Sequence, residues 1–210
     1  MPPHPCGMPL RTIRWTLSRP FSMVIDMTNN KPRILGISGS LRRESYSGAI
    51  LRRLQEAVAA QATIEVFPLA SVPLYNADLD GEQKPEAVVA LKDAIRDCEG
   101  LVLVSPEYNY GVPGVLKNAI DWASRPGYQS VLQGKPVLMI ASSPGIVGGA
   151  RAYAQLRQTL SSTLSRIVAV PEILISHVHS KVQDGRLTDE ASLKYMLEGF
   201  NALLAEIRKR

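Results

Sequence analysis

Short apolar runs alternate with longer stretches of helical periodicity along the chain from Lys31 onward. The runs at residues 101–104 and 137–140 contain only apolar residues, which is typical of strands that are covered on both faces. This alternation predicts an α/β fold in which a parallel sheet lies between two layers of helices. We predict strands at residues 33–38, 63–68, 100–105, 136–142 and 167–175, and helices near residues 47–61, 85–98, 114–124, 149–165 and 188–209.

Five strands of this kind suit a flavodoxin-like three-layer sandwich whose five-stranded parallel sheet has the order 2-1-3-4-5. In such a sheet, ligands bind at the carboxyl ends of the strands, where the strand order reverses between strands 1 and 3. The loops after strands 1, 3 and 4 should therefore carry unusual chemistry. The loop after strand 2, at residues 69–75, is by contrast a plain connection that contains one proline.

The loop after the first strand has the composition of a phosphate site. Residues 38–48 read Ser-Gly-Ser-Leu-Arg-Arg-Glu-Ser-Tyr-Ser-Gly. Gly39 lets backbone N–H groups approach an anion, Arg42 supplies charge, and the helix that follows directs its N-terminus at the same place. The predicted phosphate ligands are Ser38, Ser40, Arg42, Ser45 and Ser47.

This loop lacks the glycine pattern of a dinucleotide site, the lysine of a triphosphate site and the cysteine of a thiol phosphatase. A hydroxyl-rich loop with an arginine suits a single phosphomonoester. The alternative is an ordinary strand-to-helix turn with serines that cap the helix.

The loops after strands 3 and 4 suit a flat heterocycle, which needs apolar walls and a few fixed donors. Residues 106–114 combine tyrosines, an amide and two prolines, and residues 142–151 are rich in serine and glycine. Both loops could also be ordinary rigid turns. The candidate ring-binding residues are Pro106, Glu107, Tyr108, Asn109, Tyr110, Gly111, Ser142, Ser143, Gly145, Gly148 and Gly149.

Composition narrows the class of protein. The net charge of +5 is spread along the chain of 210 residues, so no nucleic-acid stripe is indicated, and no apolar run reaches the length of a membrane span. Cys6 and Cys98 form neither a disulfide framework nor a metal motif, which favours a reducing, cytoplasmic location. Residues 1–30 are proline-rich and weakly periodic, so we predict a disordered extension before one domain at residues 31–210.

Candidate acids and bases are few, and we expect no catalytic side chain. His177 and His179 alternate on the predicted fifth strand, and two histidines alone make a poor metal site. Glu107 is expected to anchor backbone rather than to transfer protons. Trp122 is expected in the core or at a subunit interface.

Taken together, the three loops resemble those of the NAD(P)H-dependent FMN reductase family, which includes bacterial quinone and chromate reductases. The matching segments are residues 39–43, residues 105–114 with 116–122, and residues 143–151, and the resemblance covers about residues 32–208. The family often has asparagine at the position of Ser47.

The resemblance implies that the first loop holds the FMN phosphate and that the second and third loops hold the isoalloxazine. It also implies NADPH or NADH as co-substrate, a quinone, flavin, chromate or similar small-molecule electron acceptor, and a homodimer or homotetramer. The chemistry would then be carried by FMN.

Two other functions remain open at this point. A flavodoxin-type electron carrier would bind FMN without turnover of NAD(P)H, but such carriers have acidic surfaces and this chain has a pI of about 9.3. A phosphoester hydrolase ranks last, because the first loop has no thiol and the chain offers no convincing acid–base pair.

Overall fold

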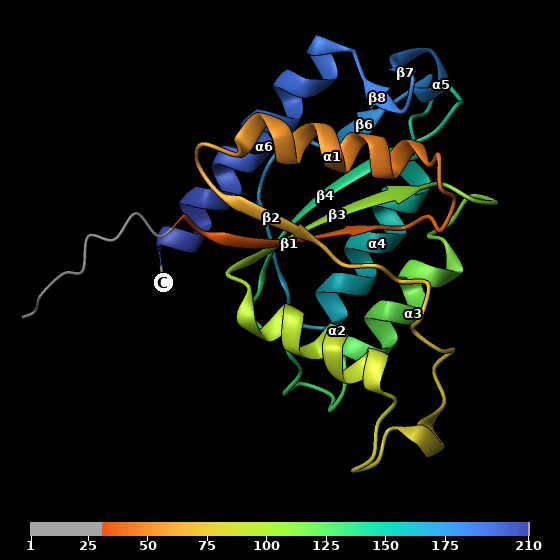
Figure 1. Cartoon of the computed structure of the whole chain (residues 1–210), viewed down its shortest axis with the longest axis vertical. Helices are drawn as coiled ribbons and strands as arrows, with labels where there is room; N and C mark the ends of the chain where they lie inside the picture. Colours follow the sequence, from red (N-terminus) through yellow and green to blue (C-terminus); the bar gives the residue numbers. More distant parts are fainter. Residues whose placement is uncertain (1–30, 210) are drawn as a thin grey trace, which may run out of the picture. The chain divides into compact units, whose positions relative to one another are not determined.

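The central sheet is parallel and has the order β2-β1-β3-β4-β5, which confirms the predicted topology (Figure 1). The computed structural model describes residues 31–209, so the predicted disordered extension at residues 1–30 lies outside the described residues. The strands are β1 (Arg33–Ser38), β2 (Thr63–Val66), β3 (Gly100–Pro106), β4 (Pro136–Ser142), β5 (Arg166–Ile167) and β6 (Ile173–Ile175).

The fifth strand is interrupted, whereas the sequence predicts one strand at residues 167–175. Ile167 pairs with Val137 and Ile173 pairs with Ile140, so five residues of the edge strand lie opposite only two residues of β4. Pro171 falls in this excess segment, where its missing N–H and fixed φ oppose regular pairing. β5 and β6 therefore pair with the two ends of β4 separately.

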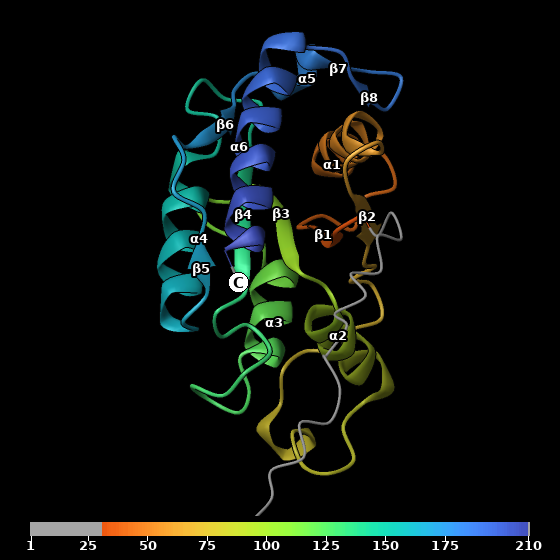
Figure 2. The ribbon, with the colours of Figure 1, turned by 90° about the vertical axis from the view of Figure 1, so that its left-hand side faces the viewer.

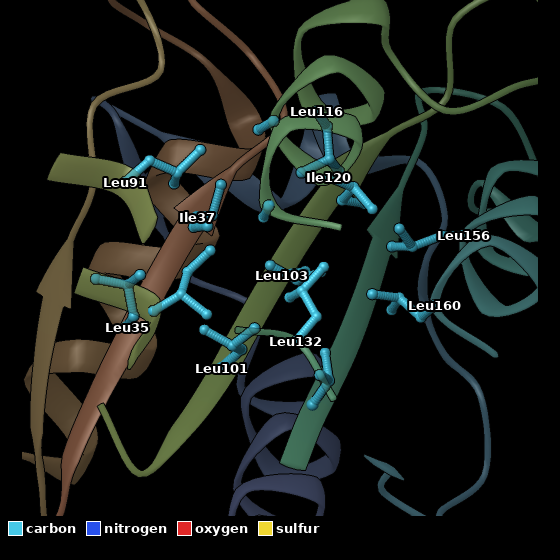
Figure 3. Close-up of a cluster of buried hydrophobic side chains, with 14 of the residues drawn as sticks. Leu35, Ile37, Leu91, Leu101, Leu103, Leu116, Ile120, Leu132, Leu156 and Leu160 are labelled. Carbon is cyan, nitrogen blue, oxygen red and sulfur yellow. The ribbon is translucent and has the colours of Figure 1, made fainter. Parts of the chain in front are cut away.

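Helices cover both faces of the sheet, as predicted (Figures 1 and 2). They are α1 (Tyr46–Val58), α2 (Glu86–Asp97), α3 (Gly114–Ala123), α4 (Ala150–Ser162) and α6 (Glu190–Arg208). Val102 and Val104 of β3 pack in one apolar cluster with residues of α1 and α6, while Leu101 and Leu103 pack in the other cluster with residues of α2, α3 and α4 (Figure 3). The alternation of side chains along a strand thus supplies both halves of the core.

The segment between β6 and α6 contains structure that the sequence analysis did not predict. It comprises the short helix α5 (Val178–Lys181) and a hairpin of β7 (Val182–Gln183) and β8 (Arg186–Leu187). Asp184 and Gly185 both have positive φ at the turn, as a two-residue hairpin with the strand twist requires. Arg186 pairs with Glu56 at 2.8 Å, so the hairpin is tied to α1.

The placement of His177 and His179 on a strand is wrong. β6 ends at Ile175, and the N–H groups of His177 and Val178 donate to the carbonyl oxygens of Gly145 and Ser143, which turns the chain into α5. Both histidines are exposed, with ring centroids 6.3 Å apart. Within residues 31–209, no group of three or more His, Cys, Asp or Glu side chains could hold a metal ion.

Trp122 lies in the core of its own chain and is fully buried. Its Nε1 donates to the carbonyl oxygen of Pro73 at 2.8 Å, and its ring packs edge-to-face with the Tyr75 ring at a centroid separation of 4.9 Å. The Nδ2 of Asn118 donates to the same carbonyl oxygen. The proline-punctuated loop after β2 is therefore anchored on α3, and Trp122 offers no surface to a partner subunit.

No helix in the described part of the chain is long and apolar enough to cross a bilayer.

Candidate active site

A pocket of about 100 Å³ lies at the carboxyl ends of β1, β3 and β4, where the predicted loops meet. Larger hollows, of about 220 Å³ beside β6 and α6, about 560 Å³ between α3 and α4, and about 340 Å³ between α2 and the segment after α3, contain none of the predicted site residues. The pocket is lined by Ser40, Arg42, Ser45, Tyr46, Ser47, Pro106, Glu107, Tyr108, Ser142, Pro144 and Val178.

Two serines at the start of α1 line the pocket, and one of them, Ser45, also caps the helix. Ser45 is the N-cap residue, and its Oγ accepts from the Gly48 N–H at 2.8 Å. The Ser47 Oγ lies 3.5 Å from the Ser45 Oγ, and both residues are buried. Because a hydroxyl that accepts at a cap keeps its own proton, Ser45 can cap α1 and donate to an anion at once. Helix capping and phosphate binding are thus compatible here.

Arg42 is held by its own loop. Its Nη2 donates to the Glu44 carbonyl oxygen at 2.8 Å, and its guanidinium lies 5.5 Å from the centre of the Tyr46 ring. Tyr46 lines the pocket and was missed by the sequence analysis, although it stands between two predicted ligands. The arrangement presents a positive charge beside the helix N-terminus, where an anion is favoured.

The loop after β3 forms a two-residue hairpin. Tyr108 and Gly111 exchange N–H···O hydrogen bonds of 3.0 and 3.1 Å, and Asn109 and Tyr110 between them have φ values of 49° and 66°. The hairpin leaves the Tyr110 side chain 73% exposed and brings the Tyr108 hydroxyl within 3.2 Å of the Ser40 Oγ. The first and second loops therefore touch at the pocket, whereas Asn109, Tyr110 and Gly111 do not line it.

Glu107 anchors this hairpin to α4, as expected. Its Oε2 accepts from the N–H groups of Arg151 and Ala152, both at 3.0 Å, which satisfies free donors at the helix N-terminus. The Gln155 Oε1 accepts from the Val112 N–H at 2.6 Å. A Cβ on Gly111 would lie 2.8 Å from the same Gln155 oxygen, so a side chain at this position would displace the Gln155 amide.

In the loop after β4, two glycines contact the sheet and not the pocket. Gly148 and Gly149 have φ values of 64° and 89°, and a Cβ on Gly149 would lie 3.2 Å from the backbone of Ser142. The Ser143 Oγ accepts from the Gly145 N–H at 3.1 Å. Of the predicted residues in this loop, Ser142 lines the pocket, together with Pro144, which was not predicted.

Ser142 has a buried hydroxyl that no other described residue bonds, and so has Ser38. A buried hydroxyl without a partner is costly, so a ligand that supplies one would be stabilised. Ser38 does not line the pocket, but Ser142 does. The set of serine hydroxyls, one arginine and one helix N-terminus fits the phosphate and ribityl oxygens of FMN.

Comparison with known proteins identifies the family. The profile of NADPH-dependent FMN reductase matches residues 32–180. A quinone reductase of Escherichia coli K12 is 41% identical over 172 residues, which cover 80% of this chain and 91% of the relative. An NAD(P)H-dependent FMN reductase of Pseudomonas aeruginosa is 39% identical over 178 residues, which cover 84% of this chain and 96% of the relative.

A solved structure agrees with these relatives. The flavoenzyme FerB of Paracoccus denitrificans, an NAD(P)H:acceptor oxidoreductase, has a TM-score of 0.74 and 32% identity, and the match covers 85% of this chain and 98% of that one. The loops at the carboxyl ends of β1, β3 and β4, the sheet order and these relatives lead to one conclusion: the chain belongs to the NADPH-dependent FMN reductase family.

Proposed function

We propose that this chain is an FMN-dependent NAD(P)H oxidoreductase that reduces quinones or related small electron acceptors. The observation that carries the proposal is the pocket in which the serine- and arginine-rich loop meets the tyrosine hairpin. The Escherichia coli relative, which is a quinone reductase, supports the acceptor class.

The residues divide into two groups by what they would bind. Ser40, Arg42, Ser45 and Ser47 would hold the FMN phosphate together with the N-terminus of α1, and Ser142 would donate to a ribityl oxygen. Pro106, Glu107 and Tyr108, which line the pocket, would contact the ring, with Asn109, Tyr110, Gly111, Ser143 and Gly145 around its rim. Ser38, predicted as a phosphate ligand, does not line the pocket, and Gly148 and Gly149, predicted at the ring, pack against the sheet, so these three residues are left out of the proposed contacts.

When bound, FMN would supply the capacity to accept a hydride from the nicotinamide and to deliver two electrons to the acceptor. The chain's own contribution is to fix and polarise the ring. The N–H groups of Asn109 and Tyr110 donate to no other described residue, and both residues form the turn of the hairpin, a conformation in which successive N–H groups can bind an anion. These two groups would donate to ring carbonyl oxygens.

A flavodoxin-type electron carrier is the second candidate. It is disfavoured by the net charge of +5 and by the relatives of about 40% identity, which are reductases. Cysteine chemistry adds nothing at this site, because burial raises the pKa of the Cys98 thiol, which lies at the end of α2. A free thiol also fits a reducing, cytoplasmic location.

A homodimer or homotetramer is part of the proposal. Leu41, Tyr110, Ile146 and Val147 are exposed apolar or aromatic residues on the three loops around the pocket. A neighbouring subunit could cover part of this rim and form a wall for the nicotinamide.

The test is the absorption spectrum of the purified protein after FMN addition and gel filtration. We expect retained yellow flavin, bleaching by NADH or NADPH without oxygen, and colour recovery on addition of 1,4-benzoquinone.

Two further measurements test the kinetic mechanism and the oligomeric state. Initial rates should give parallel double-reciprocal lines, since both substrates would use the same open side of the flavin, and light scattering should report at least a dimer. Flavin that is retained but never bleached by either nucleotide would favour the electron carrier, and absence of flavin uptake would refute the proposal.

A further inference from the structure

Arg151 occupies an unusual position beside the pocket. It lies in the first turn of α4, where no acidic residue precedes or accompanies it in that turn. The positive end of the helix dipole disfavours a cation at this place. Because a lysine or arginine is more favourable at the other end of a helix, the position of Arg151 requires another explanation than helix stability.

The contacts of its side chain place the guanidinium on the hairpin of the proposed flavin site. The guanidinium carbon lies 4.4 Å from the centre of the Tyr110 ring, within the range of a cation–π interaction. Its Nη1 lies 3.5 Å from the Oε1 of Glu107, which lines the pocket. The guanidinium is therefore held between the Tyr110 ring and the Glu107 carboxylate.

Glu107 compensates this charge only in part. Its other oxygen, Oε2, already accepts two backbone N–H groups of α4, and the separation of 3.5 Å from Arg151 is longer than a hydrogen bond. Within residues 31–209, the Arg151 side chain makes no hydrogen bond, and it is 52% exposed. Apart from this ion pair with Glu107, its N–H donors have no partner among the described residues, and they lie next to a residue that lines the pocket.

We propose that Arg151 is a specificity-determining residue that binds an oxyanion on the substrate of the flavin site. This inference rests on the proposed function. A guanidinium fork matches a carboxylate, an enolate or a phosphate, and its attachment to Tyr110 sets it beside the ring of a planar substrate. The oxyanion has two possible sources: an acidic substituent on an aromatic acceptor, or a phosphate of the nicotinamide dinucleotide.

The experiment uses the full chain with FMN and compares Arg151→Gln with Arg151→Lys. The matched control is Arg157→Gln, which removes an exposed arginine from the same helix without touching the hairpin. The acceptor pair is 2-hydroxy-1,4-naphthoquinone, an enolate at neutral pH, and its neutral 2-methoxy analogue. The nucleotide pair is NADPH and NADH, which differ by one phosphate.

If the acceptor carries the oxyanion, Arg151→Gln should raise KM for the enolate about tenfold, leave kcat nearly unchanged and spare the methoxy analogue. If the dinucleotide carries it, KM should rise for NADPH alone when the extra phosphate is bound, or for both nucleotides when the pyrophosphate is bound. Arg151→Lys should recover part of the loss in each case, and Arg157→Gln should change neither KM.

A second measurement does not depend on turnover. Calorimetric titration with 2-naphthoate, a redox-inert carboxylate, and with neutral 2-naphthamide should show a loss of naphthoate affinity in Arg151→Gln that 0.5 M salt reproduces in the parent protein. Two results would overturn the role of Arg151. One is weakened binding of both 2-naphthoate and 2-naphthamide in Arg151→Gln, and the other is unchanged KM and Kd values for all the acceptors, nucleotides and naphthalene probes. A protein that retains no flavin would refute the proposed function instead, and that result is visible in the absorption spectrum.

Discussion

The Ser142 hydroxyl allows two effects to be measured separately: its effect on the stability of the protein and its effect on the affinity for FMN. Its Oγ is buried at the end of β4 and bonds to no other described residue. We expect Ser142→Ala to leave the melting temperature of the FMN-free protein unchanged or higher, because the unpaired hydroxyl is removed. The same change should raise the Kd for FMN by roughly 5- to 15-fold, which corresponds to the loss of one hydrogen bond.

The control for this measurement is Ser105→Ala. The Ser105 Oγ donates to the Pro106 carbonyl oxygen at 2.9 Å, so this hydroxyl has a partner in the protein, and Ser105 does not line the pocket. Ser105→Ala should lower the melting temperature with little effect on FMN. A Ser142→Ala protein that loses stability and keeps its FMN affinity would show that the hydroxyl serves the fold.

Single residues also mark the limit of prediction from the sequence. Ser45 and Ser47 were predicted at the pocket and line it, because hydroxyls at the start of a helix lie beside its free N–H groups. Gly148 and Gly149 were expected at the ring, but their positive φ and missing Cβ let the loop pack on β4. Val178 lines the pocket from α5, well beyond the end of the nearest predicted loop at residues 142–151, and no local pattern indicated it.

Helix α6 offers a test at the scale of one element, at its N-cap residue Asp189. The Asp189 Oδ2 accepts from the Ser192 N–H at 2.8 Å and lies 3.6 Å from the Lys181 Nζ. The hydrogen bonds from Ser192, with the nearby Lys181 charge, lower the pKa of this carboxyl, so folding is favoured by its charged form. Asp189→Ala should reduce the free energy of unfolding by about 1 kcal/mol at pH 7.

The loss of unfolding free energy in Asp189→Ala should depend on pH, and the lowered pKa determines in which direction. Since the folded-state pKa lies below the unfolded one, the stabilisation by charge is complete above the unfolded value of about 3.9 and is lost as the pH falls through the folded value. Urea unfolding at pH 7 and near pH 3 should therefore show a smaller difference at the lower pH. Glu198→Ala, an exposed change within the same helix, should show no such trend; an equal loss at both pH values would contradict the assignment to charge.

Helices and strands were predictable from the sequence wherever a long segment has a regular hydrophobic pattern. β1 and β4 begin and end at the predicted residues, and the main helices differ from their predicted ends by only a few residues. The interrupted edge strand was not predictable from hydrophobicity, because Val168 and Ile173 continue the apolar pattern across the break. The Asp184-Gly185 pair did signal the β7–β8 hairpin, but the strands beside it are too short to show alternation.

At the scale of the whole molecule, the strand order determines which loops meet. β1 pairs with β3 and β3 pairs with β4, so segments around residues 40, 107 and 142, far apart in the sequence, lie at one edge of the sheet. The sequence predicted this convergence because it follows from topology alone. The hydrogen bonds among the loops depend on side-chain geometry and became visible only in the structure.

Because three loops from separate strands meet at the pocket, a ligand that bridges them should stabilise the entire fold. A ligand that binds only the native state adds about 2.7 kcal/mol at a free concentration one hundred times its Kd. For a domain of this size, that amounts to about 5–10 °C in melting temperature. Titration with FMN should therefore raise the melting temperature progressively and beyond saturation of the absorbance change, whereas riboflavin at equal concentration should raise it less, because it lacks the phosphate for Arg42 and the serines. Equal shifts from both flavins would place the binding energy on the ring side of the pocket and refute the phosphate role of the first loop.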